Sequence, residues 1–85
     1  MAANKPASSA DMESYEAGSS FESAIKVASV AEEYQWLRTH YPGGQMVEQS
    51  LLFHNKKPYD LLEIITEVGI NKKVYFDIST FYGKH

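Results

Sequence analysis

The sequence predicts a small α+β domain, in which one amphipathic helix packs on an antiparallel sheet in the order β-α-β-β-β. Two kinds of pattern lead to this prediction. Apolar residues recur at helical spacing over residues 30–41, and they alternate with polar residues over 45–54 and 73–79. The chain has 85 residues, enough for one domain but not for a large core. We therefore expect a single domain over residues 21–85.

The first twenty residues are rich in Ala, Ser, Glu, Asp and Gly, with few large apolar side chains apart from Met12 and Tyr15. Such a segment buries too little apolar surface to offset the entropy of ordering its backbone, so we expect a disordered tail over residues 1–20. It also lacks the apolar run of a secretory signal, and the chain contains no cysteine. Together these two features predict a cytoplasmic protein. The absence of cysteine also excludes a catalytic cysteine.

Residues 24–28, AIKVA, predict a short strand before the helix. Ser29 is expected to cap the helix, because Glu32 follows three residues later and can bond back to the amide of the cap residue. Pro42 and the two glycines after it end the helix near residue 41. The apolar residues that share one side of this helix are Val30, Tyr34, Leu37 and Tyr41.

Residues 60–67, DLLEIITE, fit the periods of both a helix and a strand. The apolar positions between Leu61 and Val68 follow a helical spacing, and Gly69 could end such a helix. However, three consecutive β-branched residues, Ile64, Ile65 and Thr66, favour an extended backbone, and the segment would span only about two helical turns. We therefore interpret it as a strand.

A tight turn at Lys56 and Lys57 would place Phe53 opposite Asp60 and Leu51 opposite Leu62. One face of the sheet, covered by the helix, then carries Val47, Leu51, Phe53, Leu62, Ile64, Val74, Phe76 and Ile78. The second face carries Met46, Leu52, Tyr59, Leu61, Ile65 and Tyr75 among polar residues. An antiparallel sheet with a single covering helix normally has a polar second face, so this apolar one predicts an interaction surface.

The leading hypothesis for function is a non-catalytic domain that binds a protein partner or forms a homodimer through the second face. The expected partner-binding residues are Met46, Leu52, Tyr59, Leu61, Ile65 and Tyr75, with Trp36 of the helix as a further anchor. Trp36 has an alternative interpretation, packing against the tail, Phe21 or the edge of the sheet. Whether the N-terminal tail covers the second face stays open.

Residues that could carry chemistry are few. His40, His54 and His85 share no ligand spacing, so no metal site is predicted. Asp60, Glu63 and Asp77 are interpreted as solvated strand charges, because no nucleophile accompanies them. We expect no cofactor and no enzymatic activity, although a small enzyme without a recognisable motif is one alternative function.

The net charge of −3 and a pI near 5.5 argue against duplex nucleic acid and an anionic membrane as partners, since both reward clustered positive charge. No stretch reaches the length of a transmembrane helix. Binding of single-stranded nucleic acid is a second alternative function. The aromatic and lysine residues that would carry it are Lys72, Lys73, Tyr75, Tyr82 and Lys84.

Overall fold

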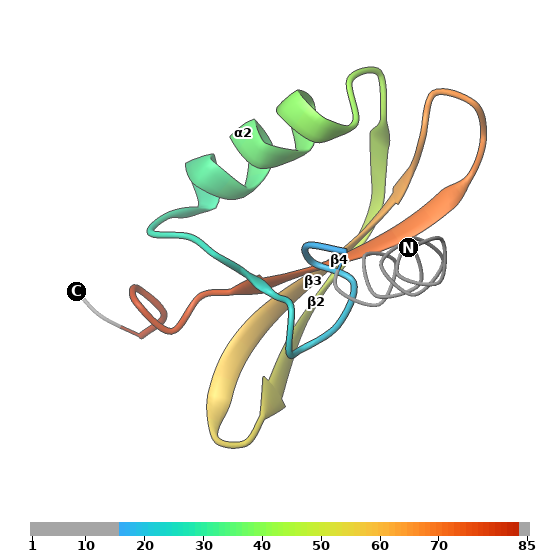
Figure 1. Ribbon diagram of the computed structural model, residues 1–85. Coiled ribbons are helices and arrows are strands. Elements are labelled where there is room, and N and C mark those ends of the chain that lie inside the picture. Colours follow the sequence, from blue (N-terminus) through green and yellow to red (C-terminus); the bar gives the residue numbers. More distant parts are fainter. Residues whose placement is uncertain (1–15, 84–85) are drawn as a thin grey trace, which may run out of the picture.

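The computed structural model describes residues 16–83, within which one helix lies against a four-stranded sheet (Figure 1). In chain order the elements are β1 (Ile25–Lys26), α2 (Val30–His40), β2 (Gln45–His54), β3 (Lys57–Ile65) and β4 (Asn71–Asp77). The predicted α+β class and the predicted order of elements are confirmed. No helix within residues 16–83 is long and apolar enough to cross a membrane.

The sheet has the spatial order β1-β4-β3-β2. β2, β3 and β4 form the predicted antiparallel meander, but β1 runs parallel to β4, with Ile25 opposite Phe76. The sheet is therefore mixed, which corrects the prediction of a purely antiparallel sheet. The helix separates β1 from the meander, so no tight turn fixes the direction of β1, and its alternation of side chains is the same in either direction.

The helix has the predicted N-cap. Ser29 is extended, and its hydroxyl accepts a hydrogen bond from the Glu32 amide at 3.2 Å. The Glu32 carboxylate accepts from the amide of Ala28 at 2.7 Å, one residue before the predicted partner. At the other end, the Tyr41 amide donates to the Leu37 carbonyl oxygen at 2.8 Å and closes the last turn. The predicted range of 30–41 is thus confirmed to within one residue.

The ambiguous segment DLLEIITE lies in β3 through Ile65, which confirms the strand. The turn before it is formed by Asn55 and Lys56, with φ angles of 52° and 65°, and not by the predicted Lys56 and Lys57. Two-residue hairpin turns of this type need positive φ at both positions, and Asn tolerates that conformation well. Phe53 therefore faces Pro58, and Leu51 faces Asp60. This shift of two residues leaves both side chains on their predicted face.

A β-bulge interrupts β2 near its start. Met46 pairs with Ile64, whereas Glu48 pairs with Glu63, so one extra residue lies on β2 between them. A bulge of this kind reverses the alternation of side chains beyond it. Met46 therefore lies on the face toward α2, where it lines a hollow together with Leu37 and Ile64. The prediction that Met46 lies on the second face was wrong.

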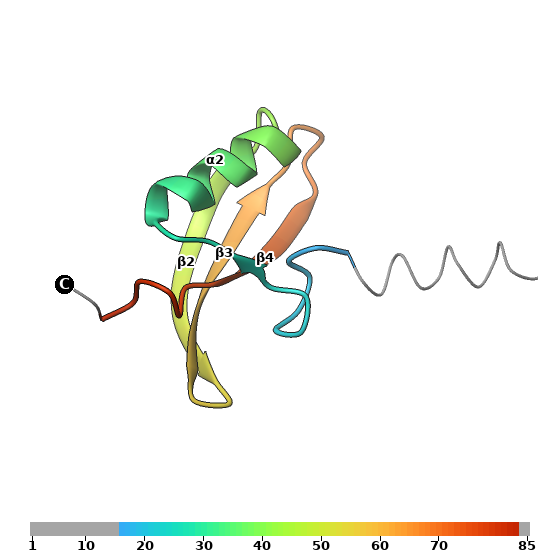
Figure 2. The same cartoon turned by 60° about the vertical axis from the view of Figure 1, so that its left-hand side comes forward.

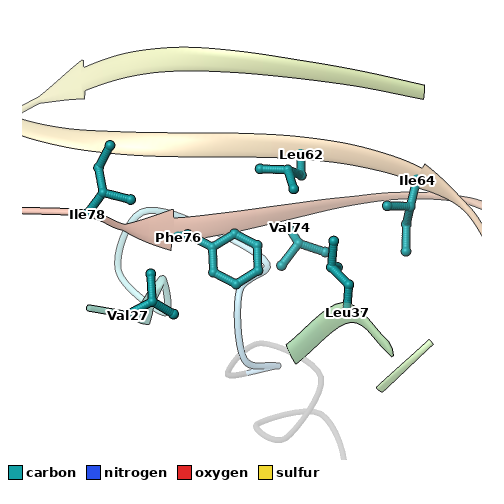
Figure 3. Packing of buried hydrophobic residues seen from close by; sticks show 7 residues of the cluster. All are labelled: Val27, Leu37, Leu62, Ile64, Val74, Phe76 and Ile78. Atoms are coloured by element: carbon teal, nitrogen blue, oxygen red, sulfur yellow. The ribbon is translucent and has the colours of Figure 1, made fainter. Parts of the chain in front are cut away.

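The hydrophobic core lies between α2 and the two central strands (Figure 3). Its buried members are Val27, Leu37, Leu62, Ile64, Val74, Phe76 and Ile78. None of the ten residues of β2 is buried. Three of them, Val47, Leu51 and Phe53, were predicted in the core but are 52%, 46% and 60% exposed. The hairpin of β2 and β3 extends beyond the helix (Figures 1 and 2), so the helix does not cover this part of the sheet.

Residues 1–15 of the predicted disordered tail lie outside the described residues, whereas residues 16–20 form turns beside β4. The Tyr75 amide donates to the Gly18 carbonyl oxygen at 2.7 Å. Gly18 is buried with φ at +81°, and a Cβ atom there would lie 2.8 Å from Cγ1 of Val74. Only glycine fits this position without strain.

Gly18→Ala is therefore expected to lower the free energy of unfolding by about 1–3 kcal/mol, through a strained φ and a clash with a core side chain. The urea midpoint measures the change. Gly83→Ala is the matched control, since Gly83 has φ at +73° but no described atom within 4 Å of the added Cβ. A shift that is equal in the two variants would show that the contact with Val74 contributes nothing.

Candidate interaction surface

Part of the second sheet face, the predicted interaction surface, is covered by the chain itself. The Phe21 ring stacks on His54 at 4.1 Å between centroids and meets the rings of Tyr59 and Tyr75 edge-on, both at 4.9 Å. Tyr59 is only 5% exposed as a result, and Leu52, which pairs with it, is half-buried. Tyr59 and Tyr75 thus belong to an intramolecular aromatic cluster that leaves little of Tyr59 for a partner.

The rest of the second face is largely polar. A hollow of about 200 Å³ is lined there by Glu48, Ser50, Leu61, Glu63 and Lys73. Of the predicted contact residues, Leu61 is half-buried in this polar surrounding, and Ile65 is 37% exposed at the end of β3. The described residues of this face therefore offer no continuous apolar surface.

An ion pair adds to the polarity of the second face. Nζ of Lys57 lies 2.9 Å from Oδ2 of Asp77. The amide and the hydroxyl of Ser79 both donate to Oδ1 of the same carboxylate. Burial opposes ionisation of Asp77, but the hydrogen bonds from Ser79 and Lys57 and the lysine charge outweigh it and lower the pKa of Asp77 to about 2. Asp77 is therefore ionised and satisfied at neutral pH.

Trp36, the predicted anchor on the helix, packs inward. Its ring meets Phe76 of the core at a right angle, with 5.7 Å between centroids, and the His40 ring stacks on it at 3.9 Å. The side chain is half-buried. The alternative interpretation, packing, is thus closer to the structure: the ring packs on the core and lines a hollow beside β1, an edge strand of the sheet, whereas Phe21 lies on the second face.

The most exposed apolar part of the sheet is the outer strand, β2. It ends the sheet, and within residues 16–83 no strand pairs with its outer side. Leu51 and Phe53 lie on the side toward α2 with roughly half of their surface exposed. Residues 45–54 contain one acidic residue, Glu48, and no Lys, Arg or Pro, which are the residues that usually protect an edge strand from pairing.

The hydrogen-bonding direction of β2 follows from its neighbours. The Pro58 carbonyl oxygen accepts a hydrogen bond from Ile78, so this residue of β3 points away from β2. Successive residues of a strand alternate in direction, so Lys57, Tyr59 and Leu61 point toward β2. Their partners in β2 are His54, Leu52 and Ser50. Gln49, Leu51 and Phe53 alternate with these partners along β2, so their amide and carbonyl groups must point outward. We call these three residues the open edge.

Behind the open edge, two carboxyl groups meet in the protein interior. Glu33 of α2 is 0% exposed and Asp60 of β3 is 7% exposed. Gln49 of the open edge donates to Asp60 at 3.4 Å, but neither carboxylate oxygen of Glu33 has a hydrogen-bond partner among the described residues. Burial raises the pKa of Glu33 to about 8, and the neighbouring Asp60 carboxyl acts in the same direction. Once protonated, Glu33 can donate to Asp60.

A buried acid with a raised pKa is a candidate for catalysis, but Glu33 has no surface that a substrate could reach. The carboxylates considered from the sequence do not converge either, since Asp60 faces the helix whereas Glu63 and Asp77 face the other way. Between residues 16 and 83, no three His, Asp or Glu side chains are placed to hold a metal ion.

Sequence reasoning missed Glu33. The signal was its spacing, three residues after Val30 and four before Leu37, which puts a carboxylate on the apolar side of the helix. Val30 itself was predicted to pack in the core, but it is 42% exposed. The buried side of the helix is therefore centred nearer to Glu33 and Leu37 than the apolar residues alone indicated.

The residues suggested for single-stranded nucleic acid are separated by the sheet. Tyr75 lies beneath Phe21 on the second face, whereas Tyr82 packs against Phe53, on the side toward α2, at 5.7 Å between ring centroids. Lys84 lies outside the described residues. Tyr75 and Tyr82 therefore do not form a common stacking platform.

Comparison of the chain with protein-family models, with curated proteins and with solved structures gave no match in any of the three. A functional hypothesis for the chain thus depends on the geometry of its own residues.

Proposed function

We propose that this chain is a non-catalytic protein-interaction domain that accepts an additional β-strand along the open edge of β2. One observation carries the proposal: the residues with outward backbone groups, Gln49, Leu51 and Phe53, include two large and exposed apolar side chains on one side of the strand. In strand addition, the backbone bonds supply affinity and the alternate side chains supply specificity. Gln49, Leu51 and Phe53 offer both.

The proposal keeps the protein-binding role expected from the sequence but moves the contact to another surface. Phe21 already covers Tyr59 and Tyr75, and the remainder of the second face is polar. On the side toward α2, Met46 is 43% exposed and extends the apolar surface beyond the open edge. A cytoplasmic location and the absence of enzymatic activity stay predictions that accompany this role.

The test uses a synthetic peptide with the sequence of β2, residues 45–54, as the strand donor. If strand addition occurs, the peptide slows amide hydrogen exchange at Gln49, Leu51 and Phe53 of the full chain, measured by NMR. The amides of Ser50 and Leu52, which point toward β3, serve as internal references and should change far less. Peptide binding that leaves the three outward amides unprotected would overturn the proposal.

Leu51→Pro provides a matched variant. Proline lacks the amide hydrogen, but this hydrogen points outward, so the ladder to β3 stays intact and the domain should fold. We expect at least about a tenfold loss of peptide affinity, because one hydrogen bond is lost and the ring obstructs the incoming strand. Leu51→Ala, which keeps the amide, separates the contribution of the side chain. Unchanged affinity in Leu51→Pro would contradict pairing at this edge.

A further inference from the structure

We infer that the strand added to β2 is the β2 strand of a second copy of this chain, antiparallel to the first, with Leu51 of both copies at the twofold axis. The inference rests on the proposed function and names its partner. It would join two four-stranded sheets into one continuous sheet across the dimer. A twofold interface needs a surface that is complementary to itself, and β2 meets this condition in both its backbone and its side chains.

The backbone selects the register. Between the bulge and the turn, the residues that point their amide and carbonyl groups outward are Gln49, Leu51 and Phe53. With the axis at Leu51, Gln49 faces the partner's Phe53, so all three residues lie in hydrogen-bonded pairs, each exchanging two bonds. An axis at Gln49 would instead bring Leu51 opposite the bulge after Met46, and an axis at Phe53 would bring it opposite the turn at Asn55. Both alternatives lose hydrogen bonds, and so do axes at Ser50 or Leu52, which bring Phe53 opposite the bulge or Gln49 opposite the turn.

The side chains agree with the same register. On the side toward α2, Leu51 faces the partner's Leu51, and the exposed ring of Phe53 faces the partner's Gln49. On the other side, Glu48 faces the partner's His54, and the twofold axis repeats this pair. Glu48 is exposed, while stacking on Phe21 holds the His54 ring in place. A carboxylate opposite an imidazole is a favourable cross-strand pair, and no two like charges face each other.

The composition of β2 also favours a second copy over an unpaired edge. Edge strands that remain monomeric usually carry lysine, proline or a central bulge. Residues 48–54 have none of these, and the bulge lies before them. The buried pair of Glu33 and Asp60 lies directly behind, since Asp60 pairs with Leu51. Pairing of two β2 strands would therefore shield the sheet around Leu51 and Asp60 from water in both copies.

Single-cysteine variants test the register, because the chain has no cysteine of its own. Facing residues of a hydrogen-bonded pair have Cα atoms about 5.5 Å apart, within the range of a disulfide. Leu51→Cys is therefore expected to form a covalent dimer under mild oxidation. Phe53→Cys is the matched control on the same side of the same strand. Its Cα would lie about 14 Å from that of the partner's Phe53, too far for a disulfide.

Sedimentation equilibrium across a concentration series tests the dimer itself, with the uncross-linked full chain. We expect the mass to rise to that of a dimer. Glu48→Lys should raise the dissociation constant about tenfold, since it removes two favourable pairs and places on the edge strand a lysine, which opposes pairing. Glu22→Lys makes the same change of charge at an exposed position outside β2 and should leave the constant nearly unchanged.

The outcomes separate the inference from the proposed function. If Phe53→Cys cross-links as readily as Leu51→Cys, the register is overturned. If the full chain stays monomeric at every concentration while the β2 peptide still protects the open edge, the second copy is overturned but strand addition stands. If the chain is monomeric and the peptide protects nothing, both fail. A dimer that persists in Leu51→Pro would place the interface elsewhere and also overturn the inference.

Discussion

Glu33→Gln is expected to make the domain more stable than the wild type at pH 8 and to remove much of the pH dependence of its stability between pH 5 and 8. Folding raises the pKa of Glu33 from its ordinary 4.5 to about 8. Below pH 4.5, the acid is protonated in both the folded and the unfolded chain, so it adds no pH dependence. Between these values the unfolded chain releases a proton that the folded chain retains, and stability falls as pH rises. Above pH 8 the loss is complete.

The effect is large for a domain of this size. Each unit of pKa difference corresponds to about 1.4 kcal/mol, so the interval from 4.5 to 8 sets an upper limit of roughly 5 kcal/mol. Water that enters beside the ionised group would reduce this figure. The total stability of a domain is only about 5–15 kcal/mol. Glutamine has nearly the shape of glutamate, remains neutral, and can donate from its amide to Asp60.

Urea midpoints at pH 5, 6, 7 and 8 measure this prediction in three proteins: wild type, Glu33→Gln and Glu22→Gln. Glu22→Gln removes an exposed acid, so its urea midpoint should change with pH in the same way as that of the wild type. Asp77 does not interfere, because its folded pKa is lowered to about 2, so its stabilising contribution is lost only as pH falls below its ordinary value of 3.8. Parallel curves for wild type and Glu33→Gln would show that Glu33 ionises freely in the folded protein.

The local elements of the fold could be predicted because each has a period or a terminator in the sequence. The cap at Ser29, the stop at Pro42 and the alternation after Lys73 define their elements without reference to the rest of the chain. The register could not be predicted as well, because it depends on a choice between two adjacent turns. Asn55 accepts a positive φ more readily than Lys57 does, and this preference of one residue moves every facing pair of the hairpin by two positions.

The candidate site was harder to predict than the fold, because burial depends on coverage. The alternation of β2 correctly gave Leu51 and Phe53 a common face with Leu62, but it could not show that α2 leaves this end of β2 uncovered. A helix of 11 residues is only about 16 Å long, too short to cover the hairpin end as well. On the second face, Phe21 was assigned to the domain but not to a position, and this one ring changes the exposure of two tyrosines.

Phe76→Ala is expected to cost the domain about 3–5 kcal/mol of unfolding free energy, the usual loss for a buried aromatic ring. Phe76 is 0% exposed and lies in the central strand β4. Its ring packs against the Trp36 ring, with 5.7 Å between the two centroids. In a chain with so small a core, this loss can unfold the domain outright. Phe76→Leu keeps much of the volume and should leave a folded protein with a smaller loss, so the prediction remains measurable.

Fluorescence of Trp36, the sole tryptophan, follows unfolding in urea and reports directly on the side chain that Phe76 contacts. Phe53→Ala, which removes a ring that is 60% exposed, is the matched control and should change the stability of the monomer by less than about 0.5 kcal/mol.

In Phe76→Leu, the smaller side chain next to Asp60 should also admit water to the buried carboxyl groups of Glu33 and Asp60. Its stability should then fall less steeply between pH 5 and 8 than that of the wild type, since hydration moves the pKa of Glu33 back toward its ordinary value. If Phe53→Ala and Phe76→Ala were equally destabilised at low concentration, the core would extend over β2, and β2 would have no free edge to offer.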